Sequence, residues 1–489
     1  MRISLFTSCI LFALTAAAGA ETKRPPMPVM TRAPAQPVIA PHGLTGHTLY
    51  VNRCIGGCTI GPGQDNATTD PPTSQYVSNA VTIPEFDGFQ PGDFEGALQC
   101  LREVYSPFNV NVVETRPTSG DYSMIMVGGT QANPAGPLLG FDGAGGVAGL
   151  PDNCQPNARG MSFAFTELLD VFAGEAGGSR PFGLCWVMAQ ETAHVFGLDH
   201  EFQFQDDQRS ACNDPMTYRD ECGGQKFFRN KIASCGEFAQ DGSRSCRCPP
   251  QQSQNSHQRL LAVFGPGTSL VPPPTNDVTT PAIDATAFPT TIITSAGSKR
   301  GIEHVDFYFN NYKWGSVPGQ QFGRTGQQNP STYSFGVPAT LPDSIYDIRV
   351  EAYDDLGAVT TSRAITLTKG APCATADTCL AGQKCEAGKC FWDEPVGIAG
   401  DACTFPQFCT TGICEGPTDA KICTTPCVVG VADSCEEGFR CLAVGNGGVC
   451  YFNAEDGGGC CSSSDGSLPA MPLLLGSALL GFVVLRRRR

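Results

Sequence analysis

The chain has 489 residues, enough for two to four domains with their own cores. Its net charge of −15 argues against nucleic acid as a partner, because phosphates are bound through cationic contacts. The acidity instead suits a soluble, secreted protein.

The N-terminus has the pattern of a targeting segment. Arg2 supplies a positive charge, an apolar run follows, and the small residues "AGA" end at Ala20. This order predicts a signal peptide over residues 1–20 that is removed after export. Residues 21–44 are rich in proline and poor in large apolar side chains, which predicts a flexible or extended linker.

The cysteines also indicate an oxidising compartment. Of the 25 cysteines, Cys9 falls in the signal segment, and Cys460 and Cys461 lie in the tail. The others form one group of ten over residues 54–248 and one of twelve over residues 373–450. Both counts are even, so we predict that disulfides close within each group. Metal-binding or redox thiols are the alternative, but no paired CxxC modules at zinc-finger spacing occur.

Residues 45–265 combine helix and strand patterns and predict an α+β domain. Apolar residues at helical spacing predict an early helix over 92–108 and a buried helix over 182–196 that ends at Gly197. The glycine-rich run 140–150 lacks the Lys-Ser/Thr of a phosphate loop, so we expect it to provide flexibility near a cleft. Strands are predicted over 47–54, 109–115, 122–129, 145–153 (an edge strand) and 160–170, the last running into a turn.

After a linker at 266–276, the periodicity changes to two over residues 277–370. Val305, Phe307 and Phe309 alternate with polar neighbours, as do the residues around Tyr346. Tyr346 resembles the tyrosine corner of immunoglobulin-like folds, so we expect an all-β immunoglobulin-like sandwich here; a β-barrel is the alternative.

The remaining chain predicts a disulfide-rich module and a membrane segment. Residues 371–452 hold frequent cysteines and few aliphatic residues, so disulfides must hold them together. In the tail, 453–489, an apolar run at 468–485 is long enough to span a bilayer, and four arginines follow it. This order resembles the MYXO-CTERM sorting signal of myxobacterial surface proteins, which implies processing near Cys460 or Cys461 and an anchored position at the cell surface. The alternative is an ordinary single-span anchor.

The stretch "AQETAHVFGLDH" carries the most specific chemical pattern. Zinc enzymes of the HExxHxxGxxH type place two histidines on one helix face, a glutamate between them, and a third histidine beyond a glycine turn. Glu191, His194, Gly197 and His200 stand at these offsets, and Gln190 replaces the first histidine.

This pattern resembles the metzincin metallopeptidases over about residues 45–265. Metzincins also carry a methionine turn beneath the zinc, and "NDPMTY" offers Met216 for it. Tyr218, two residues later, matches a tyrosine that in some metzincins ligates zinc or steadies the transition state. The resemblance implies Zn²⁺ held by His194 and His200, Glu191 as the base that activates water, and protein or peptide substrates.

Gln190 leaves two functions open. Its amide oxygen is a neutral, hard donor that zinc disfavours, so we expect weak zinc binding through Gln190, His194 and His200. Asp199 is expected to orient a histidine or to cap a turn. One hypothesis is a surface metalloendopeptidase of low activity that a Gln190→His substitution would strengthen. The other is an inactive pseudoprotease that serves in adhesion or recognition. The sequence leaves the oligomeric state open.

Overall fold

The computed structural model describes most of the chain between residues 29 and 452. The predicted signal peptide, the cysteine pair Cys460–Cys461 and the apolar run 468–485 lie outside the described residues, as does most of the linker at 266–276. The described ranges are 29–32, 44, 46–87, 90–130, 132–176, 178–206, 208–238, 242–249, 251–267, 276–278, 281–283, 290–319, 331–417, 420–430, 434–436, 438–444 and 447–452.

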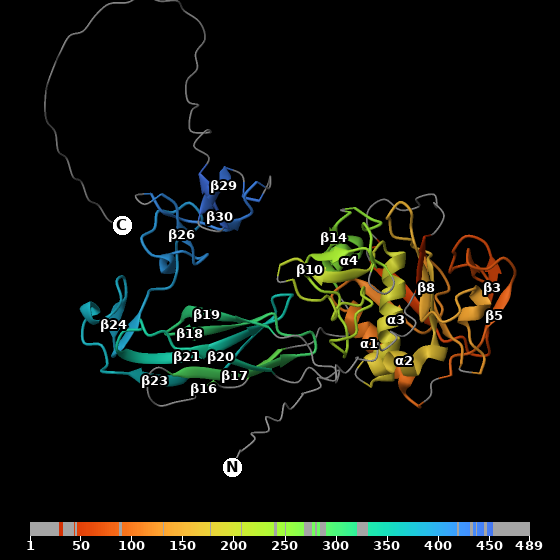
Figure 1. Ribbon diagram of the computed structural model, residues 1–489, viewed down its shortest axis with the longest axis horizontal. Coiled ribbons are helices and arrows are strands. Elements are labelled where there is room, and N and C mark those ends of the chain that lie inside the picture. The colour runs from red at the N-terminus through yellow and green to blue at the C-terminus, as the bar shows by residue number, and fades with distance from the viewer. Residues whose placement is uncertain are drawn as a thin grey trace, which may run out of the picture. The chain divides into compact units, whose positions relative to one another are not determined.

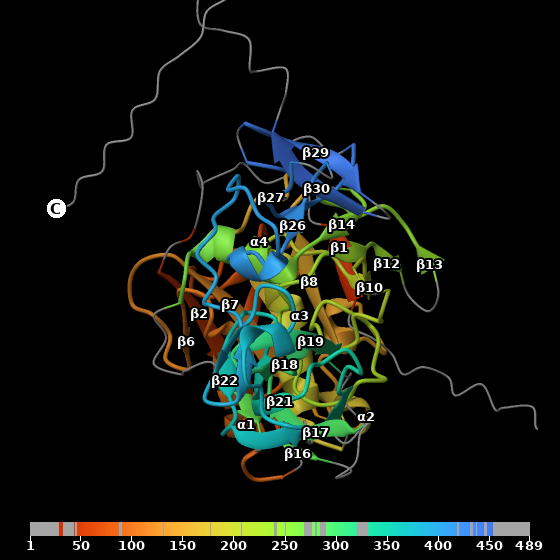
Figure 2. The ribbon, with the colours of Figure 1, turned by 90° about the vertical axis from the view of Figure 1, so that its left-hand side faces the viewer.

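The first domain is built on a six-stranded sheet of order β1-β8-β9-β7-β2-β6. All its pairs are parallel except β8 with β9, and β2, β6 and β7 lie side by side in Figure 2. β1 belongs to the proline-rich segment that was predicted to be flexible or extended, and its pairing with β8 means that β8 is not the edge strand that the sequence predicted. The strands are β1 (Val29–Arg32), β2 (His47–Asn52), β6 (Val110–Val113), β7 (Tyr122–Gly128), β8 (Gly146–Leu150) and β9 (Met161–Phe165).

Both faces of this sheet are covered, which explains its nearly continuous apolar strands. In β2, Leu49 and Val51 join the cluster beneath the helices, while Tyr50 joins a second cluster on the other face. The helices α1 (Asp93–Tyr105) and α3 (Arg180–Val195) pack together, as Figure 1 shows, and Cys100–Cys185 links them.

Shorter elements complete the first domain. The segment after β9, predicted to turn, forms two short helices, η2 (Thr166–Leu168) and α2 (Leu169–Glu175). The other helices are η1 (Gly136–Leu139) and α4 (Ser256–Phe264). Small sheets are formed by β3 (Cys58–Pro62), β4 (Thr73–Ser74) and β5 (Val81–Ile83), by β10 (Glu201–Phe204), β11 (Ala233–Cys235) and β14 (Ser253–Gln254), and by β12 (Glu237–Phe238) and β13 (Gly242–Ser243).

The next part of the chain, hereafter the β domain, encloses one apolar cluster between a four-stranded and a five-stranded sheet. Tyr346 donates from its hydroxyl to the Pro342 carbonyl at 2.7 Å, the upstream bond typical of a tyrosine corner. The first sheet holds β15 (Asn276–Val278), β16 (Ala282–Ile283), β17 (Thr291–Ser298) and β20 (Ser331–Gly336). The second holds β18 (His304–Phe309), β19 (Tyr312–Pro318), β21 (Ser344–Tyr353), β22 (Val359–Thr361) and β23 (Ile365–Lys369).

The alternation predicted for the β domain is complete in β21 and breaks in β18. Buried and half-buried residues alternate along all ten positions of β21. In β18, Asp306 is buried although it was predicted to face outward with Tyr308. Its carboxylate lies 3.3 Å from Lys313 Nζ, so this buried acid has a charged partner.

The C-terminal region is disulfide-rich and shows a repeat. Three successive sets of four cysteines each pair first with third and second with fourth, and all eleven disulfides stay within the two predicted groups. The chain divides after Phe391, so the first set belongs to the unit that holds the first domain and the β domain, and the other two form a second unit. The short elements here are η3 (Ala376–Thr378), β24 (Lys384–Glu386), β25 (Lys389–Phe391), η4 (Pro406–Phe408), β26 (Cys414–Glu415), β27 (Ile422–Cys423), β28 (Pro426–Cys427), β29 (Phe439–Val444) and β30 (Gly447–Phe452).

Within the described residues, no helix combines the length and the apolar character needed to cross a bilayer.

Candidate metal and catalytic site

The helix α3 carries Gln190, Glu191 and His194, and specific contacts fix where this helix begins and ends. Ser179 caps its start by accepting from the Phe182 N–H at 3.3 Å. Its end turns at Gly197, which has φ +90° and donates to the His194 carbonyl at 3.0 Å. A Cβ at Gly197 would lie 2.8 Å from the Cys154 carbonyl oxygen, so only glycine fits this turn.

The turn at Gly197 brings the two predicted histidine ligands together. His194 Nε2 and His200 Nε2 lie 3.0 Å apart, and both side chains are buried. The Leu198 carbonyl can only accept a hydrogen bond, so His194 donates from Nδ1 at 2.8 Å and leaves the Nε2 lone pair toward His200. Burial lowers the pKa of His194 to about 4 and that of His200 well below its usual value. Two Nε2 lone pairs that face each other at this distance would repel, so a proton or a cation must lie between the two imidazoles.

The spacing of these two nitrogens fits a metal ion. Two ligands of a tetrahedral zinc, each about 2.0–2.1 Å from the metal, lie roughly 3.3 Å apart. The 3.0 Å between the Nε2 atoms of His194 and His200 is close to this value. The bond from His194 Nδ1 to the Leu198 carbonyl is an outer bond of the kind that fixes the orientation of a ligand imidazole.

Gln190 lies one helix turn before His194, and its amide is held firmly. Its Nε2 donates to the Pro215 carbonyl at 2.9 Å and to the Thr217 carbonyl at 3.1 Å. Both partners are acceptors, which fixes the orientation of the amide. Among the described residues, Gln190 Oε1 is buried and has no hydrogen-bond partner. An unpaired buried acceptor costs stability, so this oxygen is available to a cation or to water.

Glu191 is also buried without a partner for either carboxylate oxygen in the described part of the chain. Burial raises the pKa of its carboxyl well above the usual range. The strand β8 closes one side, because a Cβ at Gly146 would lie 2.7 Å from Glu191 Cγ and one at Gly145 would overlap the Phe172 ring. These two glycines therefore permit close packing, whereas the sequence predicted flexibility for this run.

Met216 and Tyr218, which the resemblance assigns to the site, are both buried, and Tyr218 lies against His200. Met216 is fully buried, and its N–H donates to Asp214 Oδ1 at 2.8 Å. Tyr218 packs its ring 4.1 Å from the His200 ring, measured between centroids. Burial, followed by the charge of Glu191, raises the pKa of the Tyr218 phenol above its usual range.

Asp199, which was expected to orient a histidine or to cap a turn, bonds to backbone N–H groups and to Arg244 rather than to a histidine ring. Its carboxylate receives two bonds from Arg244 at 2.6 Å each, and also accepts the backbone N–H groups of His200 at 2.8 Å and Arg247 at 2.7 Å. These bonds hold the pKa of Asp199 below its usual range despite burial. Sequence reasoning missed Arg244, which lies 45 positions after Asp199 and carries no motif.

Other ligand groups in the described residues do not compete with this site. Sets of three or more His, Cys, Asp or Glu ligand atoms within 4.8 Å occur there only as three cysteine sets. Those cysteines are all disulfide-bonded and therefore cannot act as thiolate ligands. The histidine pair thus lacks a third ligand of these four types within that distance, which leaves Gln190, Tyr218 or water.

Comparisons with known proteins give little further support. No protein-family model and no curated protein matches the chain. Wild-type OgpA from Akkermansia muciniphila is 11% identical, with 69% of this chain and 95% of that chain covered and a TM-score of 0.21. A catalytically inactive OgpA bound to an O-glycopeptide substrate, glycodrosocin, is 10% identical, with 69% and 95% covered and a TM-score of 0.19.

A second kind of solved structure matches a smaller part. The fibronectin(III)-like modules of CbhA from Clostridium thermocellum are 20% identical, cover 19% of this chain and 96% of that chain, and have a TM-score of 0.13. At TM-scores this low, none of these likenesses supports a conclusion about fold or activity.

Proposed function

We propose that the first domain is a metzincin-like zinc metalloendopeptidase, carried with an immunoglobulin-like β domain on a surface protein. The observation that carries this proposal is the approach of His194 Nε2 to His200 Nε2 at 3.0 Å, one helix turn from the unpartnered carboxylate of Glu191. A pair of converging imidazoles and a buried free carboxylate are the donors and the base that metal-assisted hydrolysis requires.

The residues divide into ligands and reacting groups. His194 and His200 would hold Zn²⁺ through Nε2, and Gln190 Oε1 is the buried oxygen left to serve as a third, weak ligand. Zinc, when bound there, would supply Lewis-acid polarisation of a carbonyl. Glu191 takes a proton from the attacking water, and the Tyr218 hydroxyl donates to the oxygen on which charge develops.

The backbone at β8 supports a peptide as the substrate class. β8 packs against Glu191 through Gly146, and β1 pairs with β8 in parallel from Val29 with Val147 to Arg32 with Leu150. β8 therefore already holds an extended segment of this chain by main-chain hydrogen bonding, a common mode of peptide binding, and a substrate peptide would take the place of β1 there.

The competing function is a pseudoprotease that binds partners without cleaving them. Its support is Gln190, whose amide nitrogen has a purely structural role in tying α3 to Pro215 and Thr217. Cleavage of casein by the purified full chain, with and without added zinc and a chelator, separates the two functions. We expect slow cleavage that the chelator abolishes and zinc restores. Zinc binding with no cleavage of any unstructured protein would favour the pseudoprotease.

The disulfides support an extracellular location, whereas anchoring at the cell surface is a proposal. Eleven disulfides fit an extracellular or secreted protein. Anchoring through residues 468–485 and processing of a MYXO-CTERM-like tail are our proposal from the sequence. Intact mass spectrometry of the protein released from cells should show a species without the terminal arginines. A mature species that retains Arg489 would support a plain membrane anchor instead.

A further inference from the structure

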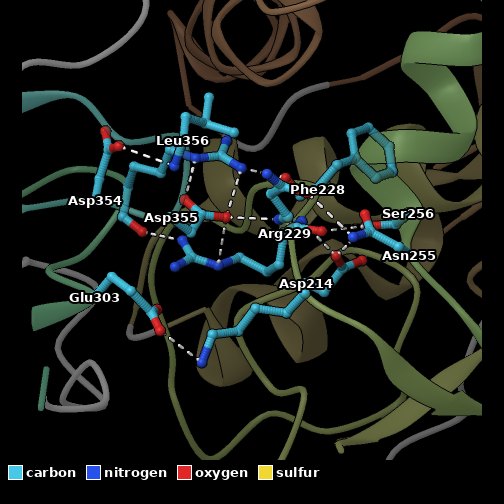
Figure 3. Close-up of polar contacts among 12 residues, drawn as sticks. Asp214, Phe228, Arg229, Asn255, Ser256, Glu303, Asp354, Asp355 and Leu356 are labelled. Atoms are coloured by element: carbon cyan, nitrogen blue, oxygen red, sulfur yellow. Dashed lines mark hydrogen bonds and ion pairs between the residues drawn. The ribbon is translucent and has the colours of Figure 1, made fainter. Parts of the chain in front are cut away.

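A buried ion cluster joins the β domain to the first domain (Figure 3). Asp355, in the loop after β21, accepts from Arg300 through both oxygens, at 2.5 and 2.9 Å, and from the Asn230 N–H at 2.7 Å. Arg229 Nε lies 3.3 Å from the same carboxylate. The side chains of Asp355, Arg300 and Arg229 are at most 4% exposed. Burial with two guanidinium groups fixes the geometry of this junction.

The cluster continues into the first domain through Asp214. The Arg229 N–H donates to Asp214 Oδ2 at 2.7 Å, and Ser256 Oγ donates to the same oxygen at 2.5 Å (Figure 3). The other oxygen of Asp214 accepts the Met216 N–H at 2.8 Å. A single buried carboxylate thus connects the cluster to the methionine turn.

The turn around Met216 holds the side chain of Gln190. The carbonyls on either side of Met216, those of Pro215 and Thr217, both accept from Gln190 Nε2. Each step from Asp355 to Gln190 is therefore a hydrogen bond, an ion pair or a short stretch of backbone.

This path matters because its backbone has no regular structure of its own. Residues 214–218 and 225–230 lie in neither helix nor strand. Their positions depend on side-chain anchors, and the buried side chains of Asp214 and Asp355 anchor the two segments. A shift of residues 225–230 would move Arg229, which bonds to Asp214. Asp214 would move with it, and so would the carbonyls that orient Gln190.

We infer that Asp355 of the β domain is a positioning residue for the metal site, which sets the place of Gln190 Oε1 through Arg229 and Asp214. This inference rests on the proposed zinc site. It makes the β domain part of the site's support, since a carboxylate outside the first domain fixes the least strong ligand. Partners behind the ligands of metal sites typically change metal affinity or activity by about 10- to 100-fold when they are removed.

The test compares Asp355→Asn with Glu303→Gln in the full chain. Glu303 also makes an ion pair between the two domains, with Lys231 at 2.9 Å, so its substitution is a matched loss of one carboxylate charge. Zinc affinity is measured by competition with a chromophoric chelator, and ligand geometry by the visible spectrum of the Co²⁺-loaded protein. We expect Asp355→Asn to weaken zinc binding by about 10- to 100-fold and to change the Co²⁺ spectrum. Glu303→Gln should change neither.

Each outcome decides the matter. Wild-type protein that binds no zinc would contradict the proposed function itself. Wild-type protein that binds zinc, with an unchanged affinity and Co²⁺ spectrum in Asp355→Asn, would overturn the inference alone. If Asp355→Asn does not fold, Arg300→Lys decides instead, because it keeps the charge and loses the forked geometry. In that variant we expect a smaller but measurable loss of zinc affinity and an altered spectrum, and wild-type values for both would overturn the inference.

Discussion

Two buried carboxyl groups in this molecule, those of Asp355 and Glu191, differ in whether they have hydrogen-bond and ion-pair partners. Asp355 meets two guanidinium groups and a backbone N–H, whereas Glu191 has no partner for either oxygen among the described residues. The neighbouring guanidinium groups, first that of Arg229, hold the pKa of Asp355 below its usual range against burial, while burial alone raises that of Glu191. A fully paired buried charge holds structure in place, and an unpaired one costs stability and marks a candidate reacting group.

The largest expected effect is on catalysis at the unpaired carboxylate. Glu191→Ala should reduce casein cleavage by roughly 10²–10⁴, the usual contribution of a general base. The comparison variant is Glu95→Ala, since the Glu95 side chain is 64% exposed on α1 and far less buried than Glu191. Initial rates of peptide release measure both variants. Equal rates for Glu191→Ala and the wild type would remove Glu191 from the reaction.

Breaking the paired cluster should affect stability strongly. Asp355→Ala leaves two buried guanidinium groups without their carboxylate and should lower the free energy of unfolding by about 3–5 kcal/mol. Glu191→Gln replaces an unpaired buried carboxyl at nearly constant shape, so its free energy of unfolding should equal or exceed that of the wild type. Urea unfolding of the metal-free proteins measures both. A greater loss in Glu191→Gln than in Asp355→Ala would reverse the comparison.

Gln190→His should separate the proposed role of this side chain as a zinc ligand from its role in hydrogen-bonding the backbone. An imidazole is a stronger zinc ligand than an amide oxygen, so zinc affinity should rise by at least about 10-fold. Gln190 Nε2 donates to two carbonyls, and a neutral imidazole has only one N–H to donate. The metal-free variant should therefore lose about 1–3 kcal/mol of stability. Zinc titration and urea unfolding test the two expectations, and a variant that gains zinc affinity at no cost in stability would mean that the two bonds are unimportant.

The smallest effect is expected in the acid limb of stability. The folded-state pKa of Asp355 lies below its unfolded value, so its contribution is complete above about pH 4 and is lost as the pH falls further. As the pH falls below about 4, the free energy of unfolding should therefore decrease less in Asp355→Asn than in the wild type. Thermal unfolding over this range measures the difference. Parallel profiles for the two proteins would show that the ion cluster does not titrate as described.

Local patterns explain how much the sequence could predict. The helix α3, its end at Gly197 and the hydrogen bond of Tyr346 follow from residues within a few positions of one another. The disulfide groups follow from counting, since export favours closed sets. These features need no knowledge of distant segments.

The contacts that sequence reasoning missed are long-range. Arg244 reaches Asp199 across 45 positions, and Asp355 reaches Asn230 across 125 positions. The close packing at Gly146 likewise depends on where Glu191 lies after folding. A motif fixes which side chains share one helix face, but only the tertiary fold determines which carboxylates find partners.

Zinc stoichiometry of the purified full chain tests the central claim most directly. We expect about one zinc per chain after dialysis against zinc, and a loss of that zinc in His200→Ala, because one of only two imidazole ligands is removed. His304→Ala is the matched control, since His304 lies on the β domain beside Tyr353, away from the site. Folded wild-type protein without zinc, or zinc retained in full by His200→Ala, would contradict a metal site at His194 and His200.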